Sequence, residues 1–226
     1  MKIVAATCVR NRENFIGAYL DMLLDFGITP IVAFGTRPWS NHADDEDEKP
    51  DRTEYILDTY FPNVNTIKDY FAHHRDSINR CVQNAGEYDL MLVNDCDMFI
   101  TRDDWASFLK FEDANKDREV YSINFEKMII EYYYDWRFGK AAIPGGDWPI
   151  VAMKPMVEFR HMTKTSCDNE VVWDEVGPKY HHMRFCKKNR IDRRCNIPTD
   201  TGNHFPAPPE IFDRLERWQG ILENLK

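Results

Sequence analysis

In "YDLMLVNDCDMFITRDDW", Tyr88 to Trp105, two aspartates one residue apart interrupt an apolar run. Leu90 to Val93 predict a buried strand, and Asp95 and Asp97 follow where that strand ends. In an extended chain, residues two apart point to the same side, so both carboxylates are expected to face one ligand. Adjacent carboxylates repel each other unless a cation lies near them, which favours a metal site over an ordinary acidic turn.

The elements before this stretch predict a parallel sheet. Lys2 to Val9 and Ile28 to Gly35 read as buried strands, and apolar residues recur at helical spacing between them, up to Gly27. Two further helices are expected at 53–61 and 68–86. The order strand, helix, strand, helix, helix, strand is typical of an α/β fold with helices on the faces of the sheet. Such sheets bind ligands at the carboxyl ends of their strands, where the two aspartates are expected.

The second half of the sequence has a different character. A short helix is expected at 101–110 and a final helix at 210–226, with apolar residues along one face of the latter. Antiparallel strands are expected at 120–125, 128–136 and 149–155.

Length, composition and charge narrow the class of protein. The chain has 226 residues, of which 43% are apolar, enough for one sizeable core. We expect a single domain over 1–226, with a nucleotide- and metal-binding half at 1–110 and an acceptor-side half at 111–200. A net charge of −9 argues against a protein that coats nucleic acid. The six cysteines lack close pairs, and neither a signal peptide nor a membrane-spanning run is recognisable, so a cytoplasmic protein is expected.

Three segments carry a resemblance to a known group of enzymes. They are "AATCVRNRENFIGAYLDMLLDFGI" from Ala5, "YDLMLVNDCDMFI" from Tyr88 and "YHHMRFCKKN" from Tyr180. Together they resemble glycosyltransferases of the GT-A fold, closest to the family-2-like enzymes. The third segment departs from the family pattern, with Cys186 where a serine is usual and His182 where a tyrosine is usual.

The resemblance implies both a fold and an activity. The fold would be a GT-A-like, mainly parallel sheet flanked by helices, with antiparallel additions in the C-terminal half. The activity would be metal-dependent transfer of a hexosyl or pentosyl group from a nucleoside diphosphate sugar to an acceptor hydroxyl. The acceptor could be a glycan, a lipid-linked sugar, a protein or a modified nucleic acid.

The resemblance also implies roles for particular residues. Asp95 and Asp97 would hold Mn²⁺ or Mg²⁺, Asp95 would also lie near the ribose, and His181 would be the third protein ligand. Hard oxygen ligands suit these ions, which bridge to phosphate oxygens. The residues implied to line the nucleotide pocket are Thr7, Val9, Arg10, Asn11 and Glu13. A helix cap with charged flanks is the alternative interpretation of these five residues.

Two charged segments stand out. Lys179 to Arg194 contains seven basic residues and one acidic residue. It could be a lid in which Lys187 and Arg190 contact the diphosphate, a surface for a phosphorylated or nucleic-acid acceptor, or a solvated basic face. The five consecutive acidic residues from Asp44 to Glu48 are expected to be a solvated segment.

The catalytic base is sought among carboxylates of the second half. An inverting transferase needs a carboxylate that deprotonates the acceptor hydroxyl, and the candidates are Asp147 in "PGGDWP" and Asp174 or Glu175 in "VVWDEVG". A retaining enzyme would lack such a base, and the sequence leaves both outcomes open.

Two other functions fit parts of the sequence. A metal-dependent nucleotidyltransferase or phosphoesterase would use the same paired aspartates but transfer phosphorus. A zinc-stabilised binding module would use Cys167, His181, Cys186 and Cys195. Zinc ligands usually include close pairs, whereas the intervals between these four residues are irregular.

Overall fold

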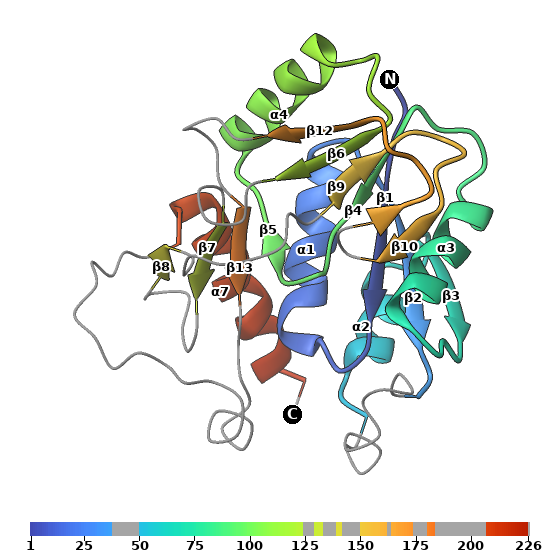
Figure 1. Ribbon diagram of the computed structural model, residues 1–226. Helices are drawn as coiled ribbons and strands as arrows, with labels where there is room; N and C mark the ends of the chain where they lie inside the picture. Colours follow the sequence, from blue (N-terminus) through green and yellow to red (C-terminus); the bar gives the residue numbers. More distant parts are fainter. Residues whose placement is uncertain are drawn as a thin grey trace.

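A seven-stranded sheet with strand order β12-β6-β9-β4-β1-β2-β3 runs through the centre of the computed structural model (Figure 1). The structure describes residues 1–37, 50–123, 129–132, 139–141, 150–161, 164–173, 180–183 and 207–225. The four N-terminal strands are parallel to one another: β1 (Ile3–Val9), β2 (Thr29–Gly35), β3 (Asn65–Asp69) and β4 (Leu90–Val93). The expected α/β class with a mainly parallel sheet is therefore confirmed.

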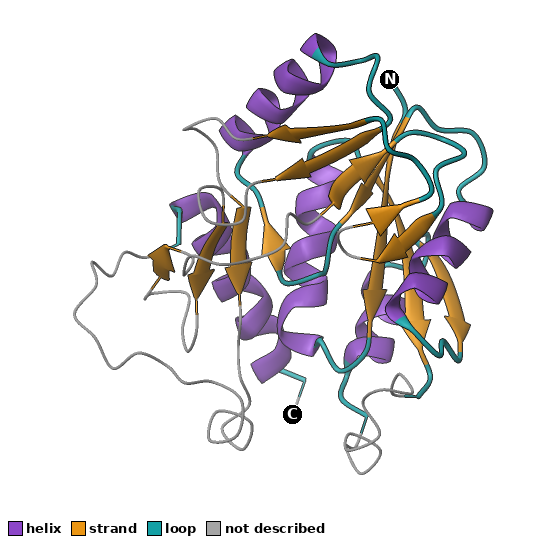
Figure 2. Cartoon of the chain, viewed as in Figure 1, coloured by secondary structure: helices purple, strands orange, loops and turns teal. Residues whose placement is uncertain are grey.

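Helices cover both faces of this sheet (Figure 2). The helices α1 (Glu13–Asp25), α2 (Thr53–Tyr60) and α7 (Pro209–Glu223) pack on one face, and α3 (His74–Asn84) packs on the other. β1 and β4 are consequently buried on both sides, which explains why both read as continuous apolar runs rather than alternating ones. None of the described helices is long and apolar enough to cross a membrane.

One strand of the structure, β3, was not predicted from the sequence. The sequence predicted a single helix over 68–86, but the chain first forms β3 and begins α3 only at His74. β3 is the edge strand of the sheet and its residues are exposed or half-buried, so it lacks the apolar pattern by which a strand is recognised. The correction matters for the site, because it places His74 just beyond the carboxyl end of a parallel strand.

The second half adds antiparallel strands, as expected, but distributes them over two sheets. The helix predicted at 101–110 is α4 and extends over Arg102–Ala114. β9 (Ile150–Met153) lies antiparallel between β4 and β6 (Val120–Ile123), and β12 (Glu170–Trp173) completes the central sheet. The strand expected at 128–136 is β7 and belongs to a second sheet, so it does not pair with β9.

The second sheet has the strand order β5-β13-β7-β8 and lies beside the first (Figure 2). Its strands are β5 (Met98–Phe99), β13 (Tyr180–Met183), β7 (Ile129–Tyr132) and β8 (Gly139–Ala141). β5 follows the two aspartates and pairs antiparallel with β13. This pairing brings a segment from late in the sequence to the aspartates. A separate hairpin of β10 (Phe159–His161) and β11 (Lys164–Thr165) packs near α3.

The close approach of α1 and α7 predicts an effect on stability. A Cβ atom on Gly17 would overlap the indole of Trp218, so Gly17→Ala should lower the free energy of unfolding by about 1–3 kcal/mol. Gly220→Ala in α7 is the matched control, because nothing lies within 4 Å of its added Cβ and alanine favours a helix by about 0.5–1 kcal/mol. Urea unfolding of both variants measures the difference. Equal stabilities would mean that α1 and α7 do not pack in this way.

Candidate active site

The carboxyl ends of β1 and β4 meet where the strand order reverses. β2 and β3 lie on one side of β1, whereas β4 lies on its other side. In open α/β sheets this switch point leaves a crevice for ligands beyond the strand ends. Cys8 lies near the end of β1 and Asp95 lies two residues after β4. Asp95 and Asp97, which follow β4, therefore lie where such folds bind ligands.

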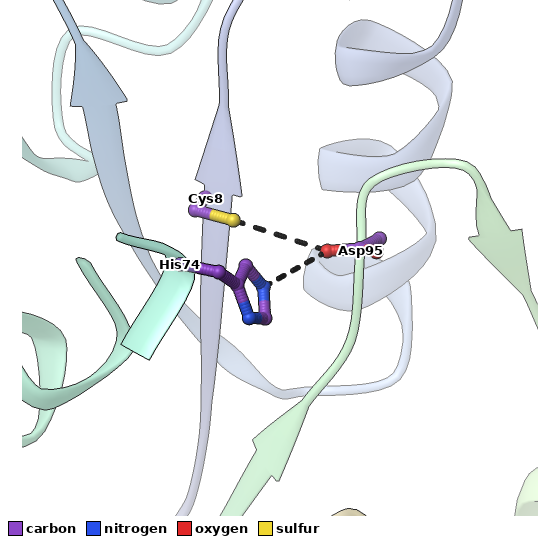
Figure 3. Close-up of side chains that lie close together, drawn as sticks. All are labelled: Cys8, His74 and Asp95. Carbon is purple, nitrogen blue, oxygen red and sulfur yellow. Dashed lines mark hydrogen bonds and ion pairs between the residues drawn. The ribbon is translucent and has the colours of Figure 1, made fainter. Parts of the chain in front are cut away.

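His74 joins Cys8 and Asp95 in a compact cluster (Figure 3). Its Nε2 lies 3.3 Å from Asp95 Oδ1, and Cys8 Sγ lies 3.9 Å from the same oxygen. The imidazole packs edge to face on Phe159, with ring centroids 5.7 Å apart, which fixes its orientation.

The electrostatics of this cluster favour a charged pair. Burial lowers the pKa of His74, but Cys8 and the Asp95 carboxylate raise it by a larger amount. The net effect is a pKa of about 11. Burial raises the pKa of Asp95, but the hydrogen bond from His74 and the charges of His74 and Arg12 lower it to about 2. Asp95 is therefore a carboxylate at neutral pH, and His74 is its imidazolium partner.

Asp97 is placed differently from Asp95. The backbone between them turns, with Met98 N donating to Asp95 O at 3.0 Å, so the expectation that both side chains project from one extended strand is wrong. Asp97 is 9% exposed, and its Oδ1 lies 3.7 Å from His182 Nε2. Burial and the nearby Asp95 charge raise its pKa, although His182 opposes this. The turn thus gives each aspartate its own partner while keeping the two charges close.

The side chains of the two neighbouring histidines of β13 lie near different aspartates. In the pairing of β13 with β5, His181 lies opposite Phe99 and His182 opposite Met98. Successive strand residues face opposite sides, so only one of the two can reach Asp97. His182 does so, whereas His181 Nε2 lies 3.9 Å from Asp104 Oδ2 in α4. The resemblance implied His181 as the metal ligand, but this structure brings His182 to the aspartate instead.

The residues expected to line a nucleotide pocket are only partly open to a ligand. Thr7 is fully buried and Val9 is 4% exposed, so their side chains belong to the core. Arg10 follows the end of β1, and its Nη1 is buried without a hydrogen-bond partner among the described residues. This nitrogen is a donor available to an anion beyond the strand ends.

Asn11 and Glu13 form a structural link between the first loop and α2. Asn11 accepts a hydrogen bond from Asp51 N at 3.2 Å and adopts a left-handed backbone, with φ of 51°. Glu13 Oε2 accepts from Arg52 Nε at 3.0 Å. The residue before α1 is Arg12, so Asn11 is not the helix cap. A role of Asn11 or Glu13 towards a nucleotide stays a prediction.

Four features of the site were not predicted from the sequence: Cys8, Arg12, His74 and the placement of His182. Burial lowers the pKa of Arg12, but the charges of Asp97 and Asp95 raise it more, so its guanidinium is a countercharge for both carboxylates. Arg12 and Cys8 lie inside the quoted N-terminal segment, and the available signal was the position of Cys8 near the end of the first strand and of Arg12 just beyond it. His74 had no such signal while its segment was read as the middle of a helix.

Asp97 offers an oxygen ligand that suits a hard divalent cation. Asp97 Oδ1 is buried and receives no hydrogen bond from the described residues. Burying a carboxylate oxygen without a hydrogen bond is costly, and Mg²⁺ or Mn²⁺ would satisfy it. His182 Nε2 lies 3.7 Å from this oxygen, and the Asp95 charge raises the Asp97 pKa. The ligand atoms of these three residues do not all lie within 4.8 Å of one another, so an ion held by all three would require side-chain movement. The other predicted site residues lie outside the described residues: Asp147, Asp174, Glu175, Lys187 and Arg190.

Comparisons with known proteins bear on the fold. No family model and no curated protein matches this sequence. Among solved structures, the crystal structure of S. aureus TarS matches 81% of this chain with a TM-score of 0.51 and 13% identity. This chain spans 37% of the length of TarS.

A second solved structure comes from Desulfovibrio desulfuricans G20 and is provisionally described as a nucleotide-diphospho-sugar transferase. It matches 99% of this chain and 98% of its own length, with 9% identity. Its TM-score of 0.44 is too low to carry an argument. The likeness to TarS, at 13% identity, concerns the fold alone, and on that basis this chain has the GT-A-like fold that its sequence resembles.

Proposed function

We propose that this chain is a metal-dependent glycosyltransferase that moves a sugar from a nucleoside diphosphate sugar to an acceptor hydroxyl. The observation that carries the proposal is the buried, unsatisfied Oδ1 of Asp97 beside His182, at the switch point of a GT-A-like sheet. A buried carboxylate of raised pKa in a ligand crevice is typical of a functional site rather than of a structural turn.

The described residues have distinct roles in this proposal. Asp97, Asp95 and His182 would hold Mg²⁺ or Mn²⁺. When bound, the ion would neutralise charge that builds on the diphosphate leaving group. Arg10, with its buried unpartnered nitrogen, would donate to a phosphate oxygen, and Arg12 would balance the carboxylates. We retain Asp147, Asp174 or Glu175 as the base and Lys187 and Arg190 as diphosphate contacts.

A screen of sugar nucleotides tests the proposed reaction. The protein is incubated with Mn²⁺ and a set of donors that differ in base and sugar, without acceptor, and the products are identified. Slow release of a nucleoside diphosphate is expected, because water replaces the acceptor in the glycosyl transfer. Release of a monophosphate or pyrophosphate would instead indicate attack at phosphorus and would overturn the proposal in favour of a nucleotidyltransferase or phosphoesterase. Asp97→Asn protein, purified identically, controls for contaminating activity.

The two histidines of β13 provide a matched pair for testing the ion site. His182→Gln should weaken Mn²⁺ binding in the presence of a nucleoside diphosphate by about 10-fold or more, because even indirect partners of a metal contribute 10–100-fold. His181→Gln should leave that affinity nearly unchanged, because His181 faces Asp104 in α4. Electron paramagnetic resonance of free Mn²⁺ measures both affinities. A larger loss in His181→Gln would restore the ligand that the sequence resemblance implied.

A further inference from the structure

The cluster of Cys8, His74 and Asp95 has the composition of a site for a different kind of cation. One ligand atom from each residue lies within 4.8 Å of the other two, and no other such group of three occurs within the described ranges. The three residues come from β1, the start of α3 and the loop after β4, so the fold rather than local sequence assembles them (Figure 3). Cys8 is 8% exposed and packs in the core, which holds its thiol in place.

Two of the three separations between these atoms are close to those of a tetrahedral ligand sphere, and the third is within 4.8 Å. Zinc bonds of about 2.3 Å to sulfur and about 2.1 Å to nitrogen or oxygen place sulfur and oxygen about 3.6 Å apart, and nitrogen and oxygen about 3.4 Å apart. The observed separations are 3.9 Å for Cys8 Sγ to Asp95 Oδ1 and 3.3 Å for His74 Nε2 to Asp95 Oδ1. An ion could therefore enter with small side-chain adjustments.

We propose that Cys8, His74 and Asp95 form a site for a borderline divalent cation such as Zn²⁺, distinct from the proposed Mg²⁺ or Mn²⁺ site at Asp97, with which it shares Asp95. Thiolate and imidazole ligands select zinc-like ions, whereas magnesium and manganese prefer oxygen. On binding, Cys8 gives up its thiol proton and His74 its extra proton, and both protons leave to solvent. Three protein ligands leave a fourth position for water or another ligand.

This site shares Asp95 with the proposed donor site, which gives it a regulatory consequence. Zinc bound by Asp95 withdraws that carboxylate from the ribose and from the neighbouring ion. Zn²⁺ should then inhibit glycosyl transfer at concentrations that fill the site, even when Mn²⁺ is in excess. This consequence rests on the proposed function, whereas the existence of the site does not.

Cobalt binding to the full chain tests the site without any donor or acceptor. Co²⁺ bound to a thiolate gives a near-ultraviolet charge-transfer band, which wild-type protein should show and Cys8→Ser should lose. Cys167→Ser is the matched control, because Cys167 is hydrogen-bonded to Glu119 and lies outside the cluster. It should keep the band, and so should Asp97→Asn, which removes the other ion site. Absence of the band in wild type, or its persistence in Cys8→Ser, would overturn the proposal.

A second variant, His74→Gln, tests the same site independently in case Cys8→Ser does not fold. His74→Gln keeps a polar side chain of similar length, and it should weaken Zn²⁺ binding in competition with a chromogenic chelator by more than about 10-fold. The neighbouring His73→Gln, outside the cluster, should bind Zn²⁺ as wild type does. Equal affinities of all three proteins would contradict the site. Since these titrations contain no sugar nucleotide, their failure would leave the glycosyltransferase proposal standing, and the reverse also holds.

Discussion

Asp97→Asn is expected to lower turnover by about 100-fold or more and at the same time to raise the melting temperature of the metal-free protein. Turnover falls because a direct ligand of the ion is lost, and even outer partners contribute 10–100-fold. Stability rises because burial and Asp95 raise the pKa of Asp97. A carboxyl group whose pKa is raised by folding destabilises the native state above its unfolded pKa, and a neutral amide removes that penalty. Activity assays and thermal unfolding in chelator measure the two effects.

Opposite changes in activity and stability distinguish a functional residue from one that only ends a strand. Asp103→Asn is the matched control, because Asp103 is exposed in the first turn of α4. It should keep full turnover and lose a few tenths of a kcal/mol through the helix dipole. Full turnover of Asp97→Asn, or undiminished wild-type turnover in excess chelator, would eliminate the metal role of Asp97.

Lys154→Met is expected to destabilise the fold by about 3 kcal/mol or more. Lys154 follows the last residue of β9, and its Nζ pairs with Glu112 Oε1 in α4, where Glu112 is only 5% exposed. Removing the lysine leaves a buried carboxylate without its counterion, which typically costs 3–5 kcal/mol. Chemical denaturation of the variant measures this loss.

Two further variants test whether the loss of stability comes from the ion pair between Lys154 and Glu112. Lys116→Met removes a lysine that pairs with Asp113 at the surface, where both side chains are more than 70% exposed, and it should cost less than about 1 kcal/mol. The double variant Glu112→Gln/Lys154→Met should recover most of the stability lost by Lys154→Met, since both charges are gone. A double variant as unstable as the sum of its single changes would show that the two residues do not interact.

The sequence was most informative where burial imposes a pattern. β1, α1, β2 and β4 carry apolar residues at strand or helix spacing, and the structure places them as predicted. The position of Asp95 and Asp97 at the carboxyl edge followed from that order alone. β3 could not be recognised, because an edge strand with exposed side chains has no apolar signature. Because β3 was not predicted, the start of α3 at His74 was not predicted either. The place of His74 beside Asp95 depends on that start.

The partner of Asp97 required tertiary structure. His181 and His182 are adjacent in sequence, and only the register of β13 against β5 decides which of them faces the aspartate. Likewise, the strand that follows the turn between Asp95 and Met98 is β5, which pairs with β13 from a distant part of the sequence. Sequence reasoning found the residue types of the site, whereas the contacts among them depend on strands far apart in the chain.

Calorimetric titration with nucleoside diphosphates tests whether an ion at Asp97 helps to bind the donor's diphosphate. Wild-type protein should bind at least one of the common nucleoside diphosphates, and Mn²⁺ should tighten that binding, because the ion bridges Asp97 to the phosphates. In Asp97→Asn the tightening by Mn²⁺ should disappear, while the affinity measured without metal should remain. If no nucleoside diphosphate binds with or without Mn²⁺, or if Mn²⁺ tightens binding equally in wild type and Asp97→Asn, this account of the site is contradicted.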